Sequence, residues 1–125
     1  MSKLKRPRRE RKFTSAAHRH SGKQESGLAK TIRGKVVPRS GAGMTKGDVR
    51  INGLCRIECK CTTKPSFSIN QALLDKIGHA AMSAGEIPAL VVRFIDDKEN
   101  TLNEVAVLRV ADLETLLSLA NHEPV

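Results

Sequence analysis

Apolar residues recur along the chain with spacings that predict three helices. The segment SINQALLDKIGHAAMSAG has apolar residues every three or four positions and ends at Gly85, as an amphipathic helix does. An earlier segment, SGKQESGLAKTIRGK, has similar spacing between a capping residue at Ser21 and a stop at Gly34. ADLETLLSLA predicts a closing helix that begins at Asp112.

Shorter runs between and around these helices are typical of strands. PALVVRFID is almost continuously apolar, which predicts a strand buried on both faces of a sheet. The predicted strands are residues 35–40, 44–51, 55–62, 88–96 and 104–110. The order α, β, β, β, α, β, β, α predicts the α/β class, with a small mixed β-sheet flanked by helices, because a helical crossover leads from a hairpin to a central strand.

The second and third predicted strands are joined by Asn52-Gly53, a pair that favours the positive φ angles of a two-residue type I′ turn. Such a turn makes the two strands antiparallel neighbours. We therefore expect Asp48 on one strand to lie close to Glu58 on the other.

Side chains alternate in direction along the third strand, so its two faces differ in chemistry. The cysteines share one face with an isoleucine and charged residues occupy the other: Cys55, Ile57, Cys59 and Cys61 against Arg56, Glu58, Lys60 and Thr62. A structural zinc site combines about four ligands from two pairs, whereas these thiols lie on one strand with no second pair. We interpret them as small buried hydrophobic residues in a reducing compartment.

The charged face of this strand carries the candidate chemistry. Asp48 and Glu58 would present two carboxylates to one ion, which are the hard oxygen ligands that Mg²⁺ prefers, and Lys60 shares the face of Glu58. Phosphodiester hydrolysis needs a metal ion to polarise a phosphate oxygen, a nucleophilic water and a cation near the developing charge. The alternative is an exposed strand with an ordinary Glu–Lys pair.

Positive charge is concentrated near the N-terminus. Residues 1–24 contain nine Lys or Arg and one Glu, a net charge of +8 out of +9 for the whole chain. We predict a disordered basic arm over 1–21 and one folded domain over 22–125, because the arm has too little apolar surface to fold alone. Its expected partner is a polyanion, above all nucleic acid, although such an arm can also serve only solubility. The arm residues expected to contact DNA are Lys5, Arg6, Arg8, Arg9, Arg11 and Lys12.

The composition disfavours several classes of protein. The chain has no Trp or Tyr and three Phe, so it lacks the aromatic platforms of carbohydrate enzymes and of proteins that stack single-stranded bases. It has no apolar run long enough to span a membrane and no recognisable secretory leader, so we expect a cytoplasmic protein with no membrane partner.

A glycine-rich segment, GAGMTKGD, lies before the hairpin. It lacks the Gly-Lys-Ser/Thr ending of a nucleotide-binding P-loop, and a strand instead of a helix follows it. With Arg39, Ser40 and Lys46 beside its glycines, this loop suits close approach to a nucleic-acid phosphate.

These features together resemble a known superfamily. Asp48 followed by ECK at 58–60 in a hairpin resembles the PD-(D/E)XK nuclease motif, although Gly47 stands where that motif has proline. The element order resembles the core of the same superfamily, so residues 22–125 would form a nuclease domain. The chain looks most similar to archaeal-type Holliday junction resolvases and their viral relatives, through Glu25, VVPRSGAG, the aspartate, IECKCTTKPSFSI and IPALVVRF, which together cover residues 22–95.

The resemblance implies roles for individual residues. Asp48 and Glu58 would bind a divalent metal, Mg²⁺ or Mn²⁺, together with the backbone carbonyl of Cys59, and Lys60 would position and activate the attacking water. Glu25 would complete the acidic cluster, unless it is a solvent-facing helix carboxylate. The residues of the folded domain expected to contact DNA are Arg39, Ser40, Lys46, Lys64 and Gln71.

The function implied by this resemblance is a metal-dependent, structure-selective DNA endonuclease that makes paired nicks in four-way junctions. A junction has approximate two-fold symmetry, so paired incision predicts a homodimer with two active sites. Its interface is expected at an apolar strand or at the leucines of the last helix: Leu113, Leu116, Leu117 and Leu119. The alternatives are a nicking or restriction-type nuclease of the same superfamily and a non-catalytic, basic nucleic-acid-binding protein.

Overall fold

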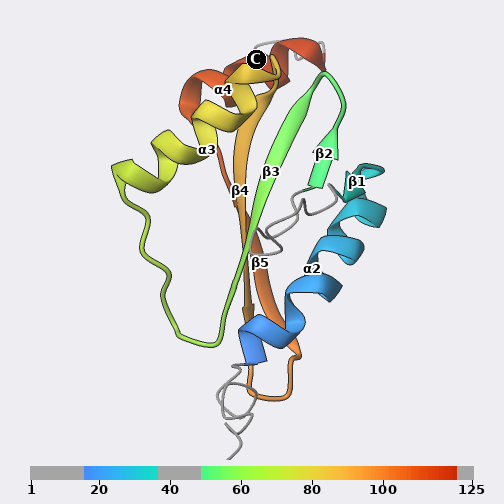
Figure 1. Ribbon diagram of the computed structural model, residues 1–125, viewed down its shortest axis with the longest axis vertical. Helices are drawn as coiled ribbons and strands as arrows, with labels where there is room; N and C mark the ends of the chain where they lie inside the picture. The colour runs from blue at the N-terminus through green and yellow to red at the C-terminus, as the bar shows by residue number, and fades with distance from the viewer. Residues whose placement is uncertain (1–15, 37–48, 121–125) are drawn as a thin grey trace, which may run out of the picture.

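The computed structural model describes residues 16–36 and 49–120 and confirms the predicted α/β class. The elements in chain order are α2 (Ala16–Ile32), β1 (Lys35–Val36), β2 (Val49–Ile51), β3 (Cys55–Thr62), α3 (Gln71–Ser83), β4 (Ile87–Ile95), β5 (Thr101–Val107) and α4 (Val110–Leu119). Figure 1 shows α2 on one side of the strands and α3 on the other, with α4 at one end of the sheet.

All described strands belong to one mixed sheet with the order β1-β2-β3-β4-β5. β3 and β4 run parallel because α3 crosses over between them, and the other neighbouring pairs are antiparallel. β4 is buried on both faces, as its continuous apolar run predicts: Leu90 is 1% exposed and Val91 is 5% exposed. β4 is therefore a fully buried interior strand, and it pairs with the charged strand β3 along the whole length of β3.

Two hydrophobic clusters hold the helices to opposite faces of this sheet. The first cluster joins α2 to the sheet and consists of Leu28, Ala29, Val49, Ile57, Cys59, Ala89 and Val91. The second cluster joins α3 to the sheet and consists of Ile77, Leu90 and Val92, with Phe67, Leu73, Phe94 and Val107 packed against it. The prediction that the cysteine-bearing face of β3 is its apolar face is confirmed by the first cluster.

α2 begins earlier than the sequence pattern predicts, at Ala16 instead of Ser21. Residues 16–21, which were predicted to belong to the basic arm, form the first turns of this helix. The cause is a tertiary contact: the buried ring of His20 lies 2.9 Å from a guanidinium nitrogen of Arg93 and 3.2 Å from a carboxylate oxygen of Glu99. These contacts hold the first turns of the helix on the sheet.

The end of α2 lies where the sequence predicts, but glycine serves a different purpose there. Arg33 adopts the left-handed φ of 60°. The amide of Gly34 donates to the carbonyl of Ala29 at 2.8 Å. A Cβ atom on Gly34 would lie 2.9 Å from the carbonyl oxygen of Arg50. Glycine is therefore required for the close approach of this segment to β2.

The β2–β3 hairpin is confirmed, but the predicted two-residue type I′ turn is wrong. Ile51 pairs with Cys55, which leaves a three-residue loop. Within that loop only Gly53 has a positive φ, 76°. Its amide donates to the carboxylate of Glu86 at 2.8 Å, while the amide of Leu54 donates to the carbonyl of Ile51 at 2.9 Å. A long-range hydrogen bond thus sets the turn conformation.

The closing strand and helix are confirmed with shifted ends. The predicted strand 104–110 is observed as Thr101–Val107, and α4 begins at Val110 instead of Asp112. Asp112 lies in the first turn and accepts from Arg109 at 2.6 Å, so it stabilises the start of the helix from inside it. Within the described ranges, no helix has the length and apolar character needed to cross a membrane.

Candidate active site on strand β3

Glu58 and Lys60 lie side by side on the face of β3 that is turned toward α3. Their partners in the parallel ladder are Leu90 and Val92, which belong to the α3 cluster, and paired residues of adjacent strands share a face. Lys60 Nζ lies 3.3 Å from Glu58 Oε2. The side chains are 24% and 19% exposed, respectively, so the ion pair is sheltered by the fold yet open to solvent.

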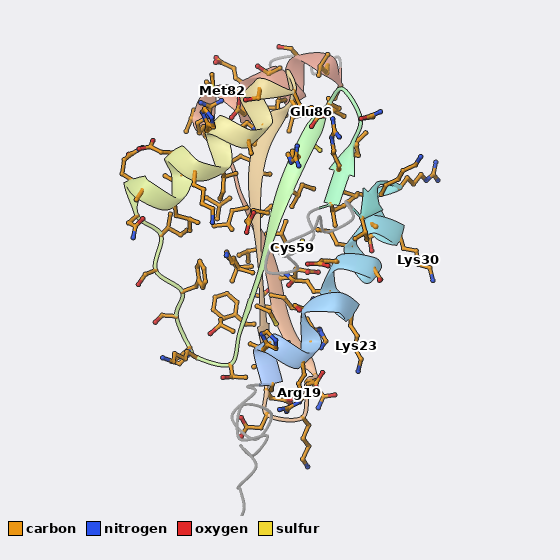
Figure 2. All side chains as sticks on the ribbon, viewed as in Figure 1. Arg19, Lys23, Lys30, Cys59, Met82 and Glu86 are labelled. Atoms are coloured by element: carbon orange, nitrogen blue, oxygen red, sulfur yellow. The ribbon has the colours of Figure 1, made fainter. Side chains whose placement is uncertain are left out.

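Cys59 separates the two charged residues and points the other way. Figure 2 shows it in the middle part of β3. It is 3% exposed and packs in the α2 cluster. Because this side chain is fixed between sheet and helix, the backbone of β3 is anchored at the position between Glu58 and Lys60.

Several residues predicted for the site fall outside the part of the chain that the structure describes. They are Asp48, Arg39, Ser40 and Lys46, and in the arm Lys5, Arg6, Arg8, Arg9, Arg11 and Lys12. The predicted proximity of Asp48 and Glu58 stays a prediction, because Asp48 is not described. The structure shows only that their neighbours Val49 and Ile57 pair in the β2–β3 ladder.

A buried glutamine attaches α2 to the backbone of the candidate site. The side-chain amide of Gln24 donates to the carbonyl of Lys60 at 2.8 Å and lies 3.5 Å from the carbonyl of Val91. Gln24 is fully buried, and its Oε1 has no hydrogen-bond partner among the described residues. No sequence pattern predicted this contact, because only the tertiary fold brings the side chain of a helix residue to backbone carbonyls of the neighbouring strands β3 and β4.

Glu25 follows Gln24 and is also buried, with 4% exposure. It is therefore no solvent-facing carboxylate, so that alternative is wrong. However, α2 packs on the face of the sheet that carries Cys59, whereas Glu58 projects from the opposite face. The structure places Glu25 next to the helix residue that contacts β3 but does not bring it onto the same face as Glu58.

Lys64 and Gln71 lie on either side of the connection from β3 to α3, and both are exposed. The amide of Lys64 donates to the hydroxyl of Thr62 at 3.0 Å, which fixes the backbone just after the strand. The side-chain amide of Gln71 donates to Asp75 at 2.9 Å on the surface of α3. Both residues are reachable by a large ligand on the α3 side of the sheet.

The cysteines are free thiols that are buried or half-buried on the α2 face: Cys55, Cys59 and Cys61. Burial raises the pKa of Cys55 above its usual value, which favours the protonated thiol over a metal-binding thiolate. In residues 16–36 and 49–120, no three His, Cys, Asp or Glu side chains come together as a group able to hold a metal ion.

A buried carboxylate at the hairpin was not predicted from the sequence. The side chain of Glu86 is fully buried and accepts from Arg50 at 2.8 and 2.9 Å and from the amide of Gly53 at 2.8 Å. The hydrogen bond from Arg50 holds the pKa of Glu86 below its usual range. A lone acidic residue directly before a buried strand was the only sequence signal for this contact.

A second network, built around the buried His20 at the far end of the sheet, was not predicted either. Arg93 donates to His20 Nε2 at 2.9 Å and to Glu104 at 2.9 Å. A guanidinium can only donate, so Nε2 of the neutral ring accepts and Nδ1 donates to Glu99. This hydrogen bond from His20 lowers the pKa of Glu99. The partners are too distant in sequence for any local pattern to predict them.

Comparisons with known proteins leave the site to be interpreted from its own geometry. No family model, no curated protein and no solved structure matches this chain.

Proposed function

We propose that this protein is a metal-dependent, structure-selective DNA endonuclease that hydrolyses phosphodiester bonds in four-way junctions. The observation that carries the proposal is the Glu58–Lys60 pair, with 3.3 Å between Nζ and Oε2, on a half-buried face in the middle of a mixed sheet. Cys59, between them, is fixed in the core, which holds the backbone that carries both charged side chains.

Chain connectivity supports a role for Asp48. Val49 pairs with Ile57, the residue just before Glu58. Asp48 is bonded to Val49, so its Cα lies about 3.8 Å from that of Val49. In our proposal the next step of this register brings the Asp48 carboxylate opposite Glu58. Carboxylate oxygens are the ligands that Mg²⁺ and Mn²⁺ prefer.

We assign a role to each candidate residue from the chemistry of its side chain. A divalent ion held by Asp48, Glu58 and the Cys59 carbonyl would supply Lewis-acid stabilisation of phosphate charge. Lys60 orients the attacking water through its ammonium group and stabilises the charge that develops on the phosphate. Glu25 on α2 is a further acidic candidate. It belongs to the face opposite Glu58, so it would act at the site only from the side of β3 that the described part of β2 leaves open.

The basic and polar residues outside the candidate active site are proposed to bind the DNA substrate. The basic arm, the glycine-rich loop, Lys64 and Gln71 would contact the DNA backbone, which favours recognition by shape rather than by base sequence. Paired nicks in a two-fold symmetric junction would require a homodimer. The exposed leucines of α4 are candidates for its interface: Leu113, Leu117 and Leu119.

A non-catalytic nucleic-acid-binding protein is the second candidate. It is favoured by the basic arm, since residues 1–24 carry +8 of the net charge of +9. In that case the Glu58–Lys60 pair would be structural, and the basic arm would account for the whole function.

The decisive experiment offers the full-length protein a labelled four-way junction and a linear duplex with the same arm sequences, in Mg²⁺, Mn²⁺ or EDTA. We expect paired nicks in the junction, dependent on the metal and absent with Glu58→Gln. Nicks in the linear duplex at the same rate would indicate a nicking or restriction-type nuclease. Tight binding without cleavage in either metal would establish the non-catalytic alternative.

A further inference from the structure

The solvent side of α2 carries cations and no exposed carboxylate. Lys23 and Lys30 point away from the sheet in Figure 2, and Arg19 lies at the start of the helix, beside the connection from β4 to β5. The side chains of Arg19 and Lys23 are 51% and 72% exposed. The one acidic residue of the helix, Glu25, is 4% exposed and faces the protein interior. A helix with this distribution presents a row of positive charge to solvent along its length.

The positive row continues past the end of α2 onto the edge of the sheet. Arg33, Lys35 and Arg50 line a hollow of about 330 Å³ beside β1 and β2, and its other lining residues are uncharged: Gly34, Val36, Ile51 and Asn52. Arg50 is already paired with Glu86, so Arg33 and Lys35 supply the excess charge at this edge. We call the row and the hollow together the α2–β1 surface.

One carboxylate reduces the charge at the other end of this surface. Glu99 lies 3.5 Å from Arg19 and 3.8 Å from Lys23. It also accepts from His20, so its charge is shared among several donors. Lys30 and the edge of the sheet are far along the helix from Glu99, and the α2–β1 surface keeps a net positive charge.

The α2–β1 surface and the candidate active site belong to opposite faces of the sheet. α2 covers the face of Cys59, while Glu58 and Lys60 project toward α3. A duplex that follows the outside of α2 therefore runs along the face opposite Glu58. A branched nucleic acid reaches both faces with two segments that leave a common point in different directions.

We propose that the α2–β1 surface binds the backbone of a second DNA duplex arm, distinct from the arm that is cut at Glu58. This inference rests on the proposed function. It explains how the protein would distinguish branched DNA from linear DNA. The 17-residue helix is about 25 Å long, which matches the length of about seven base pairs. Chain connectivity joins this surface to the basic arm at Ala16 and to the glycine-rich loop after Val36.

The test measures the affinity of the full-length protein for a fluorescent four-way junction and for a linear duplex over a series of salt concentrations. The test variant is Lys23→Glu combined with Lys30→Glu. Both side chains are exposed. Because Lys23 lies 3.8 Å from Glu99, circular dichroism and a thermal melt of the variant verify that the fold is retained. The matched control is Lys76→Glu, an exposed lysine of α3, which covers the other face of the sheet from α2. Binding is measured without divalent metal, so it does not depend on cleavage.

The double variant is expected to bind the junction about tenfold more weakly or worse, and the slope of log K against log salt should become shallower by about 0.9 for each phosphate that the protein no longer neutralises. Its affinity for the linear duplex falls less, and the control matches the wild type. Unchanged junction affinity, or an equal decrease on both substrates, would overturn the proposal. A selective decrease in junction binding in a protein that never cleaves DNA would keep the α2–β1 surface and reject the nuclease.

Discussion

The side-chain amide of Gln24 donates to the backbone carbonyl of Lys60 at 2.8 Å, so α2 is attached to β3 at the residue that carries the candidate catalytic ammonium group. Gln24 is fully buried at this contact. A helix that packs on the Cys59 face of the sheet therefore fixes the backbone that carries Glu58 and Lys60 on the other face.

Replacing Gln24 by Leu keeps the side-chain volume and removes the donor. We expect the free energy of unfolding to fall by about 1–2 kcal/mol. We expect the single-turnover cleavage rate to fall between about tenfold and a hundredfold, because Lys60 moves relative to Glu58. Thr31→Val is the control on the same helix, since its hydroxyl donates to the carbonyl of Gly27 at 3.0 Å within α2 itself. A Leu variant that cleaves at the wild-type rate would remove the positioning role of Gln24.

Two glycines of the N-terminal region should respond to substitution in opposite ways. Gly34→Val places a Cβ 2.9 Å from the Arg50 carbonyl and should lower the free energy of unfolding by about 1–3 kcal/mol. Gly22→Ala meets no atom within 4 Å and lies inside α2, so it should raise that free energy by about 0.5–1 kcal/mol. Chemical denaturation measures both. The same sign for the two variants would contradict the described contact between α2 and β2.

The ion pair of Glu86 and Arg50 should make stability depend on pH in a defined direction. The pKa of Glu86 is lowered in the folded state, chiefly by the hydrogen bond from Arg50. The pair therefore stabilises the fold fully above the unfolded-state pKa, about 4.3, and this stabilisation is lost as pH falls through the lower folded-state pKa.

Glu86→Gln should accordingly lower Tm by several degrees at neutral pH and by much less in acid, measured against the wild type at the same pH. Glu114→Gln, on the exposed surface of α4, is the control and should leave Tm unchanged. A deficit in the Glu86 variant that stays constant down to about pH 3 would show that the carboxylate charge does not contribute.

Local patterns predicted the order and type of the helices and strands, because amphipathic spacing and apolar runs depend only on neighbouring residues. Parts of the predicted strands 35–40 and 44–51 lie outside the described residues. The alternation of side chains along β3 also predicted that Glu58 and Lys60 share one face of the strand, where they form an ion pair. The N-terminal boundary of α2 was wrong because it depends on His20 and its contact with Arg93, which are 73 residues apart.

The turn between β2 and β3 was mispredicted for the same physical reason. Asn-Gly favours a type I′ turn locally, but Glu86 accepts from the amide of Gly53 and fixes a longer loop. The burial of Glu25 on the face opposite Glu58 could not be predicted either, since helix spacing does not tell which face of a sheet a helix covers.

The most direct test of the central claim is the single-turnover rate of junction cleavage in Mg²⁺ for Glu58→Gln, Lys60→Met and Asp48→Asn, each with its junction affinity measured in parallel. Glu104→Gln is the control, an acidic residue on β5 that pairs with Arg93. The account predicts that the rate falls at least about 100-fold in the three variants, with binding free energies changed by less than about 1 kcal/mol. Cleavage at the wild-type rate by Glu58→Gln would contradict it.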